Sequence, residues 1–125
     1  MTLAACKPVA FVGTRNRPAA KAFYGETLGL SQVGEDDFAV VYDLAGTMLR
    51  LTDIADHVAK PSTVLGWLVA DIVAAAAELR EQGVVFQVYE GLGQDEQGIW
   101  RAPGGDARIA WFLDPDGNNL SITQL

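Results

Sequence analysis

Residue types that commonly carry nucleophilic or metal chemistry are scarce in this sequence. It contains one cysteine, Cys6, and one histidine, His57. A catalytic nucleophile needs a base close by on a rigid element, whereas Cys6 lies near the N-terminus and His57 lies in a polar, proline-containing stretch. A single cysteine also excludes an internal disulfide and a zinc site built from cysteines. We therefore predict no catalytic triad and interpret Cys6 as an inert thiol and His57 as a solvated linker residue.

Arg50 and Ser121 are the polar residues best placed to hold a ligand, because each stands between two apolar residues. Side chains alternate between the two faces of a strand, so these polar side chains point away from their apolar neighbours. On such a face the Arg50 guanidinium can bind a carboxylate or another planar anion through two parallel hydrogen bonds. An equally weighted alternative is an ion pair between Arg50 and an acid of a neighbouring strand, such as Asp43 or Asp53.

Aromatic residues are the other candidates, since small-molecule sites are largely apolar with a few placed polar groups. Most aromatic side chains of a small domain belong to its core. Trp67, for example, shares the parity of Leu65 and Val69, which we expect to face a helix. The aromatic residues that we expect to contact a ligand are Phe11, Tyr42 and Trp100.

The composition indicates a globular protein. The 125 residues suffice for one domain, and 50% of them are hydrophobic and 20% charged. The net charge of −7 argues against nucleic acid as a partner, because binding a phosphate backbone requires clustered lysine and arginine. The acidity either attracts a cationic ligand or serves solubility alone. No apolar run approaches the roughly 20 residues that cross a bilayer, and no signal peptide is evident, so we expect no membrane partner and a cytoplasmic location.

The first half of the chain predicts the order β-α-β-β-β over about residues 7–53. Its predicted strands cover residues 8–14, 30–33, 38–43 and 47–52. Asn16 is a suitable helix N-cap, Pro18 fits the first turn, and Gly29 ends the helix. A polar stretch over about residues 54–62 is typical of a linker.

The same order recurs over about residues 63–125. Asp71 is a suitable N-cap for a second helix that ends at Gly83. The predicted strands cover residues 64–69, 84–89, 99–102, 109–113 and 120–123, which is one strand more than in the first half. Residues 114–117, Asp-Pro-Asp-Gly, predict a type I turn, in which we expect Asp114 and Asp116 to shape the backbone and not to react.

Two segments of the chain resemble the vicinal oxygen chelate superfamily, which includes glyoxalase I, extradiol dioxygenases and bleomycin-resistance proteins. One segment runs from Ala22-Phe23-Tyr24 to Leu28-Gly29-Leu30, and the other is Ala110-Trp111-Phe112-Leu113-Asp114-Pro115-Asp116-Gly117-Asn118. They lie in the family's order on opposite halves of the duplicated pattern. The resemblance implies an α+β fold and a single domain over residues 1–125, in which each β-α-β-β-β module curls into a cupped, mixed sheet around a pocket.

The resemblance also identifies the positions that hold metal in metal-dependent members of the superfamily. These positions lie on the first and last strands of each module, and here they are Val9, Arg50, Val64 and Ser121. Divalent-metal sites need imidazole, carboxylate or thiolate donors, and an arginine repels the cation. Residues 7–14 and 62–69 offer no His, Asp, Glu or Gln as substitutes. We therefore expect these four residues to contact a ligand, with no metal or other cofactor, which disfavours glyoxalase and dioxygenase chemistry.

These observations predict a metal-independent small-molecule-binding protein, of the bleomycin-resistance or sequestration type. Its ligand is expected to be cationic or to bear a carboxylate. The segment Glu35-Asp36-Asp37-Phe38-Ala39 is similar to a hairpin of bleomycin-resistance proteins, and the resemblance implies a homodimer. The alternatives are a glyoxalase-like lyase or isomerase on a small carbonyl substrate, with a carboxylate base such as Glu90, a metal enzyme with other ligands, and a domain whose dimer surface serves another protein.

Overall fold

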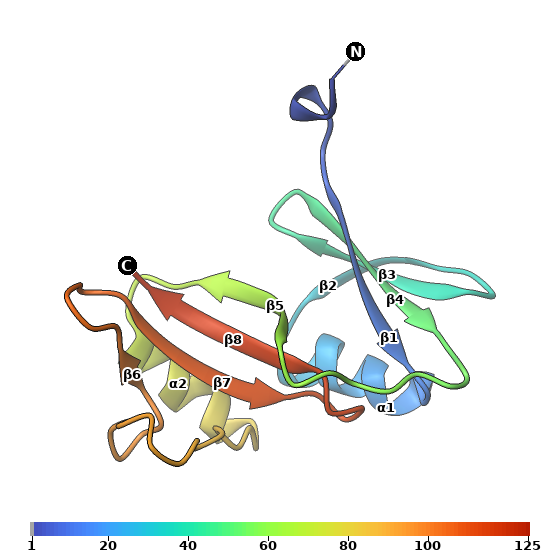
Figure 1. The fold of residues 1–125 in the computed structure, drawn as a ribbon. Coiled ribbons are helices and arrows are strands. Elements are labelled where there is room, and N and C mark those ends of the chain that lie inside the picture. Colours follow the sequence, from blue (N-terminus) through green and yellow to red (C-terminus); the bar gives the residue numbers. More distant parts are fainter. Residues whose placement is uncertain (1) are drawn as a thin grey trace. The chain divides into compact units, whose positions relative to one another are not determined.

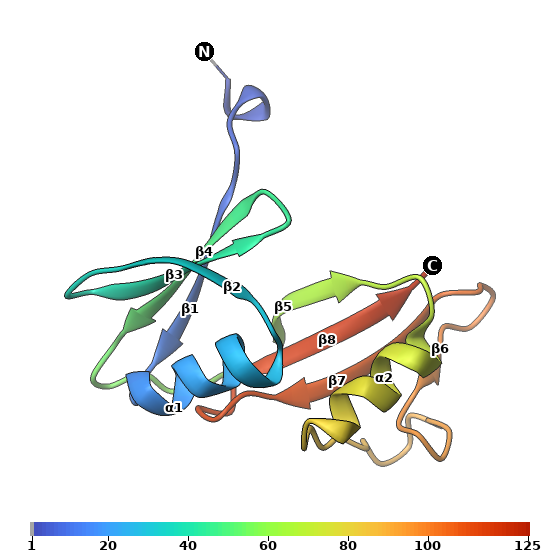
Figure 2. The same cartoon turned by 180° about the vertical axis from the view of Figure 1, so that it is seen from behind.

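The computed structural model describes residues 2–125, and the chain divides into two compact units. The first unit ends at Val58 and the second begins at Ala59, inside the stretch predicted as a linker. Each unit holds one four-stranded mixed sheet and one main helical segment (Figures 1 and 2), which makes the chain an α+β protein. No helix within residues 2–125 is long and apolar enough to span a bilayer.

The first unit has the order β-α-β-β-β that the sequence predicted. After a short 3-10 turn, η1 (Leu3–Ala5), its strands are β1 (Val9–Thr14), β2 (Ser31–Glu35), β3 (Ala39–Leu44) and β4 (Thr47–Asp53). They are arranged in the sheet as β1-β4-β3-β2, and β1 runs parallel to β4. The parallel pair brings the first and last strands of the module side by side.

The helical segment of the first unit consists of α1 (Arg17–Lys21) and a π-helical continuation, η2 (Ala22–Thr27). Asn16 caps α1 by accepting a hydrogen bond from the Ala19 N–H at 3.2 Å, and Gly29 follows with a φ of +72°, as predicted. The π turn differs from the uniform α-helix expected from the sequence. It contains Gly25, where an added Cβ would lie 3.7 Å from the Tyr42 hydroxyl, so the helix approaches the sheet closely at this point.

The second unit repeats this organisation. Its elements are β5 (Thr63–Leu68), α2 (Ile72–Glu81), β6 (Trp100–Arg101), β7 (Arg108–Leu113) and β8 (Asn119–Gln124). The strand order is β5-β8-β7-β6, again with the first and last strands parallel. Asp71 caps α2 by accepting a hydrogen bond from the Ala74 N–H at 3.1 Å. Helix α2 contacts β7 and β8 on one face of the sheet (Figure 2).

The strand predicted over residues 84–89 does not form. Only an isolated bridge joins Phe86 to Phe112, and the strand predicted over residues 99–102 shrinks to the two residues of β6. The Gln94 side chain holds this irregular stretch: its Nε2 donates to the carbonyls of Gln87 and Gly98, at 2.8 and 2.7 Å. Side-chain hydrogen bonds thus replace a strand ladder, which is why alternating apolar residues were misleading here.

In each unit the core lies between the helical segment and one face of the sheet. Tyr24, Leu49 and Leu51 are fully buried in the first unit, and Phe112 and Leu120 are buried in the second. The predicted alternation is therefore confirmed, because Arg50 and Ser121 lie on the opposite face of their strands. We call this opposite face, in each unit separately, the helix-free face.

The turn at residues 114–117 has the structural role predicted from its sequence. The Asp114 carboxylate, 5% exposed, accepts hydrogen bonds from the backbone N–H groups of Asp116 and Asn118, both at 2.9 Å. It also accepts one from the Asn118 side chain at 2.8 Å. Gly117 adopts a φ of +85°, a conformation that favours glycine. These contacts connect β7 to β8 and set the start of the strand that carries Ser121.

Candidate functional site

Arg50 lies on the helix-free face of the first unit, directly opposite Phe11 in the parallel β1–β4 pair. Its side chain is 29% exposed, and one guanidinium nitrogen lies 3.4 Å from an Asp36 carboxylate oxygen. Neither of the predicted partners pairs with it: Asp43 accepts the Gly46 N–H at 2.9 Å, and Asp53 binds Arg17. The predicted partners of Arg50 were wrong because the β2–β3 turn, which carries Asp36, reaches this face. A single long hydrogen bond leaves guanidinium N–H groups for a ligand.

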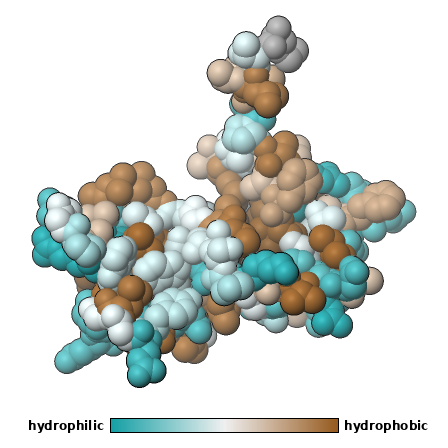
Figure 3. Space-filling view, viewed as in Figure 1, coloured by the Kyte–Doolittle hydropathy of each residue, from teal (hydrophilic) through white to brown (hydrophobic). Residues whose placement is uncertain are grey.

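Phe11 and Val9 extend this face along β1. Phe11 is 64% exposed beside Arg50, and Val9 is 43% exposed opposite Met48. Val9 and Met48 also line a surface pocket of about 340 Å³ together with Lys7 and Asp43. Figure 3 shows largely hydrophobic surface around the beginning of β1. The arrangement combines a partly exposed cation with apolar contact area, as small-molecule sites require.

Tyr42 does not lie on this face, so its expected position was wrong. It is opposite Leu49 in the β3–β4 pair, fully buried, and its ring centroid lies 6.3 Å from that of Tyr24. Its buried hydroxyl has no hydrogen-bond partner within residues 2–125. Burial, and secondarily the charge of Glu35, raises the pKa of the Tyr42 hydroxyl. Tyr42 belongs to the core beneath the helical segment.

His57 is not the solvated linker residue that the sequence suggested. Its imidazole lies against Gly13, where an added Cβ would be only 2.5 Å from the ring Nδ1. Gly13 shares the face of Phe11, two residues along β1, so half-buried His57 covers the end of the helix-free face. A glycine inside a strand can indicate such a close approach, and Gly13 was the available signal in the sequence.

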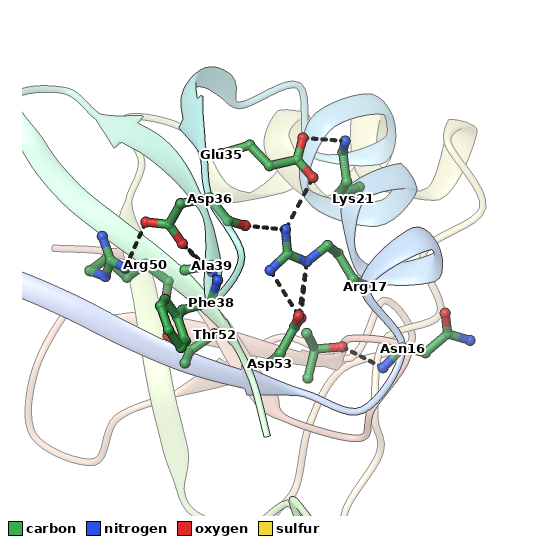
Figure 4. A network of polar contacts seen from close by, with 11 residues as sticks. Asn16, Arg17, Lys21, Glu35, Asp36, Phe38, Ala39, Arg50, Thr52 and Asp53 are labelled. Atoms are coloured by element: carbon green, nitrogen blue, oxygen red, sulfur yellow. Dashed lines mark hydrogen bonds and ion pairs between the residues drawn. The ribbon is translucent and has the colours of Figure 1, made fainter. Parts of the chain in front are cut away.

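A network of charged side chains holds Asp36 near Arg50 (Figure 4). Arg17 binds the Asp53 carboxylate, with its closest contact at 2.8 Å, and donates to the Asp36 carbonyl at 2.7 Å. Glu35 contacts Arg17 at 3.2 Å and Lys21 at 2.8 Å. The network connects α1, the β2–β3 turn and the end of β4. It therefore positions the turn that supplies the Arg50 counter-ion.

Two carboxylates of this network are electrostatically stabilised in their charged form. Lys21, and then Arg17, lower the pKa of Glu35. The backbone N–H groups of Phe38 and Ala39 lower the pKa of Asp36, with a smaller contribution from Arg50. A lowered folded-state pKa contributes stability at a pH above the ordinary values of 4.5 for Glu and 3.8 for Asp. That stability is lost as the pH falls through the lowered values.

We therefore expect acid to destabilise the protein partly through Glu35. Urea unfolding midpoints between about pH 7 and about pH 3 should fall less steeply for Glu35→Gln than for the wild type, because the neutral amide does not titrate. Glu26→Gln is a matched control, since Glu26 is an exposed glutamate on η2. Equal pH dependence in Glu35→Gln and the wild type would contradict this assignment.

Ser121 lies on the helix-free face of the second unit, between Trp111 of β7 and Gly66 of β5. It is only 7% exposed, and an added Cβ at Gly66 would lie 2.6 Å from its Oγ. Val64 lies at an irregularity of the β5–β8 register and is 47% exposed. The register thus places Gly66, and not Val64, beside Ser121.

Trp100 is on the same face of the second unit as Trp111, with ring centroids 6.0 Å apart. Tyr89 is on the other side of Trp111, at 5.7 Å and nearly perpendicular to it. The Tyr89 hydroxyl accepts a hydrogen bond from the Asn119 side chain at 3.0 Å. Asn119 was not predicted to lie at this site. The available signal was its position two residues before Ser121, which places both side chains on the same face of the strand. Glu90, the candidate base, is exposed in the turn that follows Tyr89.

The residues at the four family positions do not fit a divalent metal. Val9 and Val64 have no donor atom, Arg50 is a cation, and Ser121 supplies a single hydroxyl. Within residues 2–125, no three side chains of His, Cys, Asp or Glu gather closely enough to hold a metal ion. The residues that the strand register places beside Arg50 and Ser121 are Phe11 and Gly66, not Val9 and Val64. Neither Phe11 nor Gly66 has a side-chain atom that can bind a metal.

A family model matches most of the chain. The model described as "Glyoxalase/Bleomycin resistance protein/Dioxygenase superfamily" matches residues 8–122. The chain belongs to this superfamily. The resemblance to vicinal oxygen chelate proteins is thereby confirmed. No curated protein matches the sequence.

Solved structures of superfamily members share the fold. A member from Sphaerobacter thermophilus is 24% identical with a TM-score of 0.74, and the match covers 97% of this chain and 98% of that one. A glyoxalase family protein from Enterococcus faecalis is 22% identical, with a TM-score of 0.71 and 94% of each chain covered. One from Alicyclobacillus acidocaldarius, a glyoxalase/bleomycin resistance protein/dioxygenase, is 16% identical with a TM-score of 0.73, covering 96% and 91%. At these identities the likeness concerns the fold.

Proposed function

We propose that this superfamily member binds a small organic molecule without a metal ion and uses Arg50 to hold a carboxylate or another planar anion of that molecule. The observation that carries the proposal is the state of the Arg50 side chain. It is partly exposed on the helix-free face, and its one ion pair within residues 2–125, with Asp36, is 3.4 Å long. Exposed ion pairs of this kind contribute little, so a ligand carboxylate with two parallel hydrogen bonds can replace Asp36.

The surroundings of Arg50 support a ligand with an apolar body. Phe11 stands directly opposite Arg50 and exposes most of its ring, and Val9 continues the apolar surface along the strand. A ligand that covers Phe11 removes apolar surface from water, while the guanidinium orients its anionic group. Asp36 serves as a resident counter-ion that keeps Arg50 on this face when no ligand is bound.

This geometry favours an anionic ligand over a cationic one. Arg50 itself is a cation, and the nearest carboxylate on this face, Asp36, is already paired with it. Sequestration of a cationic drug of the bleomycin type therefore rests on the overall charge and the similarity of the segment 35–39. The lyase or isomerase alternative depends on Glu90, which water surrounds on an exposed turn, and no contact of Glu90 favours that role.

A native mass spectrum of freshly purified protein tests the proposal together with our expectation of a homodimer. The cytoplasmic location stays a prediction. We expect a metal-free dimer that retains an anionic organic molecule. Arg50→Ala should lose that molecule. Arg50→Lys should keep part of it, because lysine retains the positive charge but not the planar guanidinium group that forms two parallel hydrogen bonds. Arg101→Ala is the matched control: Arg101 pairs with Asp106 on an exposed surface and should not affect retention.

Two results would overturn this proposal. Stoichiometric metal that survives dialysis would show that other residues form a metal site and would favour the metal-enzyme alternative. Full retention of the organic molecule by Arg50→Ala would show that Arg50 is not its anchor.

A further inference from the structure

The helix-free face of the second unit carries a row of three aromatic rings formed by Tyr89, Trp111 and Trp100. Trp111 is in the middle, 5.7 Å from Tyr89 and 6.0 Å from Trp100 between ring centroids. Trp111 lies opposite Ser121, and Trp100 opposite Ile109, so the strand register places both indoles on this face. Tyr89 is 39% exposed, and the two indoles are half-buried. We call these three residues the aromatic row.

Hydrogen bonds hold one end of the aromatic row in place. The Asn119 side chain, 4% exposed, donates to the Tyr89 hydroxyl at 3.0 Å and to the Pro61 carbonyl at 3.1 Å. Its oxygen accepts from the Thr63 hydroxyl at 3.2 Å, and the Tyr89 N–H donates to Gln94 at 2.7 Å. Both N–H groups of the Asn119 amide are thereby used, and one of them fixes the Tyr89 ring. A row fixed before binding loses little entropy when a ligand arrives.

Ser121, beside the aromatic row, has an unused hydrogen-bonding group. Ser121 is only 7% exposed, and its hydroxyl makes no hydrogen bond within residues 2–125. The Ser121 Oγ lies where a Cβ at Gly66 would be, 2.6 Å from that position, so Gly66 makes room for the hydroxyl. A ligand that supplies a partner to this hydroxyl gains a hydrogen bond without breaking one inside the protein.

The helix-free face around the row carries no charged side chain on β5 to β8 within the described residues. Arg101 of β6 lies opposite Arg108 of β7. Each arginine is next in sequence to a residue of the helix-free face, Trp100 or Ile109. Because side chains alternate along a strand, both arginines point to the other face. An uncharged aromatic surface beside the Ser121 hydroxyl selects by stacking and by hydrogen bonding.

We infer that the aromatic row and Ser121 form a binding site for a planar aromatic molecule with a hydrogen-bonding substituent. The ring stacks on the indoles of Trp111 and Trp100, and the substituent pairs with the Ser121 hydroxyl. This inference rests on the proposed small-molecule function and names the chemistry of its aromatic part, but it uses none of the contacts that Arg50 makes.

Titration of the wild-type protein with 2-naphthol, followed by the indole N–H signals in a nitrogen-15 correlation spectrum, tests the site. We expect saturable shifts at Trp100 and Trp111 and none at Trp67, which pairs with buried Ile122 on the helix side. Decahydro-2-naphthol has the same skeleton without planarity and should bind about tenfold more weakly. Ser121→Ala should weaken 2-naphthol roughly fivefold and leave the affinity for naphthalene, which has no hydroxyl, unchanged.

The inference is overturned if 2-naphthol does not shift Trp100 and Trp111, if Trp67 shifts equally, or if the saturated alcohol binds as tightly. It is also overturned if Ser121→Ala weakens naphthalene as much as 2-naphthol. The proposed function has a separate readout: retention of an organic molecule in the native mass spectrum, without shifts of Trp100 and Trp111 by 2-naphthol, supports the function and refutes the aromatic site. Saturable binding of 2-naphthol by a protein purified without any adduct supports the site and not the function.

Discussion

Replacement of Phe112 by alanine is expected to lower the free energy of unfolding by about 3–5 kcal/mol, the usual cost of removing a large buried aromatic side chain. Phe112 is 1% exposed on the helix side of β7, and its ring lies 5.7 Å from that of Phe86. Its backbone also forms the single bridge that joins the irregular segment to the sheet. The substitution opens a cavity where the α2 side of the sheet is packed. Urea unfolding followed by circular dichroism measures the loss.

Leu113→Ala is the matched control for this prediction, because Leu113 is the next residue of the same strand. Leu113 points to the helix-free face and is 40% exposed. We expect it to cost about 1 kcal/mol or less, as is typical of partly exposed positions. Losses of similar size at both residues would contradict the division of β7 into a core face and a helix-free face.

Asp114→Ala is expected to cost about 3 kcal/mol or more, since hydrogen bonds to a charged group contribute about 1.5–3 kcal/mol each and are not fully additive. The Asp114 carboxylate accepts hydrogen bonds from two backbone N–H groups and from the Asn118 side chain. Asn118 is only 2% exposed, so its amide has little access to water as a substitute. Thermal and urea unfolding of the variant measure the effect.

A graded substitution separates these contacts. Asp114→Asn keeps one oxygen for the two backbone donors but presents an NH₂ group to the Asn118 amide, so its cost should fall between that of the wild type and that of Asp114→Ala. Asp37→Ala, at an exposed aspartate of the β2–β3 turn, should stay within about 0.5 kcal/mol of the wild type. If Asp114→Asn proves as stable as the wild type, the Asn118 side-chain contact contributes nothing.

Local interactions explain why much of the fold was predictable from the sequence. Asn16 and Asp71 cap helices through bonds to residues three positions away, and Asp114 closes its own turn. The placement of Arg50 opposite to Leu49 and Leu51 follows from the alternation of side chains along a strand, which needs no knowledge of the partner strand. The superfamily motifs also depend on contiguous residues, and the family match over residues 8–122 confirmed them.

The residues that make up the site could not all be predicted from the sequence, because their positions depend on contacts between residues that are distant along the chain. Tyr42 lies in the core because the β3–β4 register pairs it with Leu49, and no pattern within residues 38–43 reveals that register. The same limit hid Asp36 as the partner of Arg50 and Gly13 as the position against which His57 packs. The segment 84–99 was misjudged for a related reason, since Gln94 satisfies its backbone through side-chain bonds that leave no periodic signal.

The sequence by itself determined the superfamily, the β-α-β-β-β order of each half, the faces of Arg50 and Ser121 and the lack of donor side chains at the four family positions. These features depend on residue type, on alternation along one strand and on contacts within a few residues. Only the tertiary structure decided that Asp36 neutralises Arg50, that Tyr42 is buried, and that Tyr89, Trp111 and Trp100 form a row beside Ser121. Those relations are set by strand register and by the course of irregular segments, where small differences in packing energy over the whole unit decide which side chains meet.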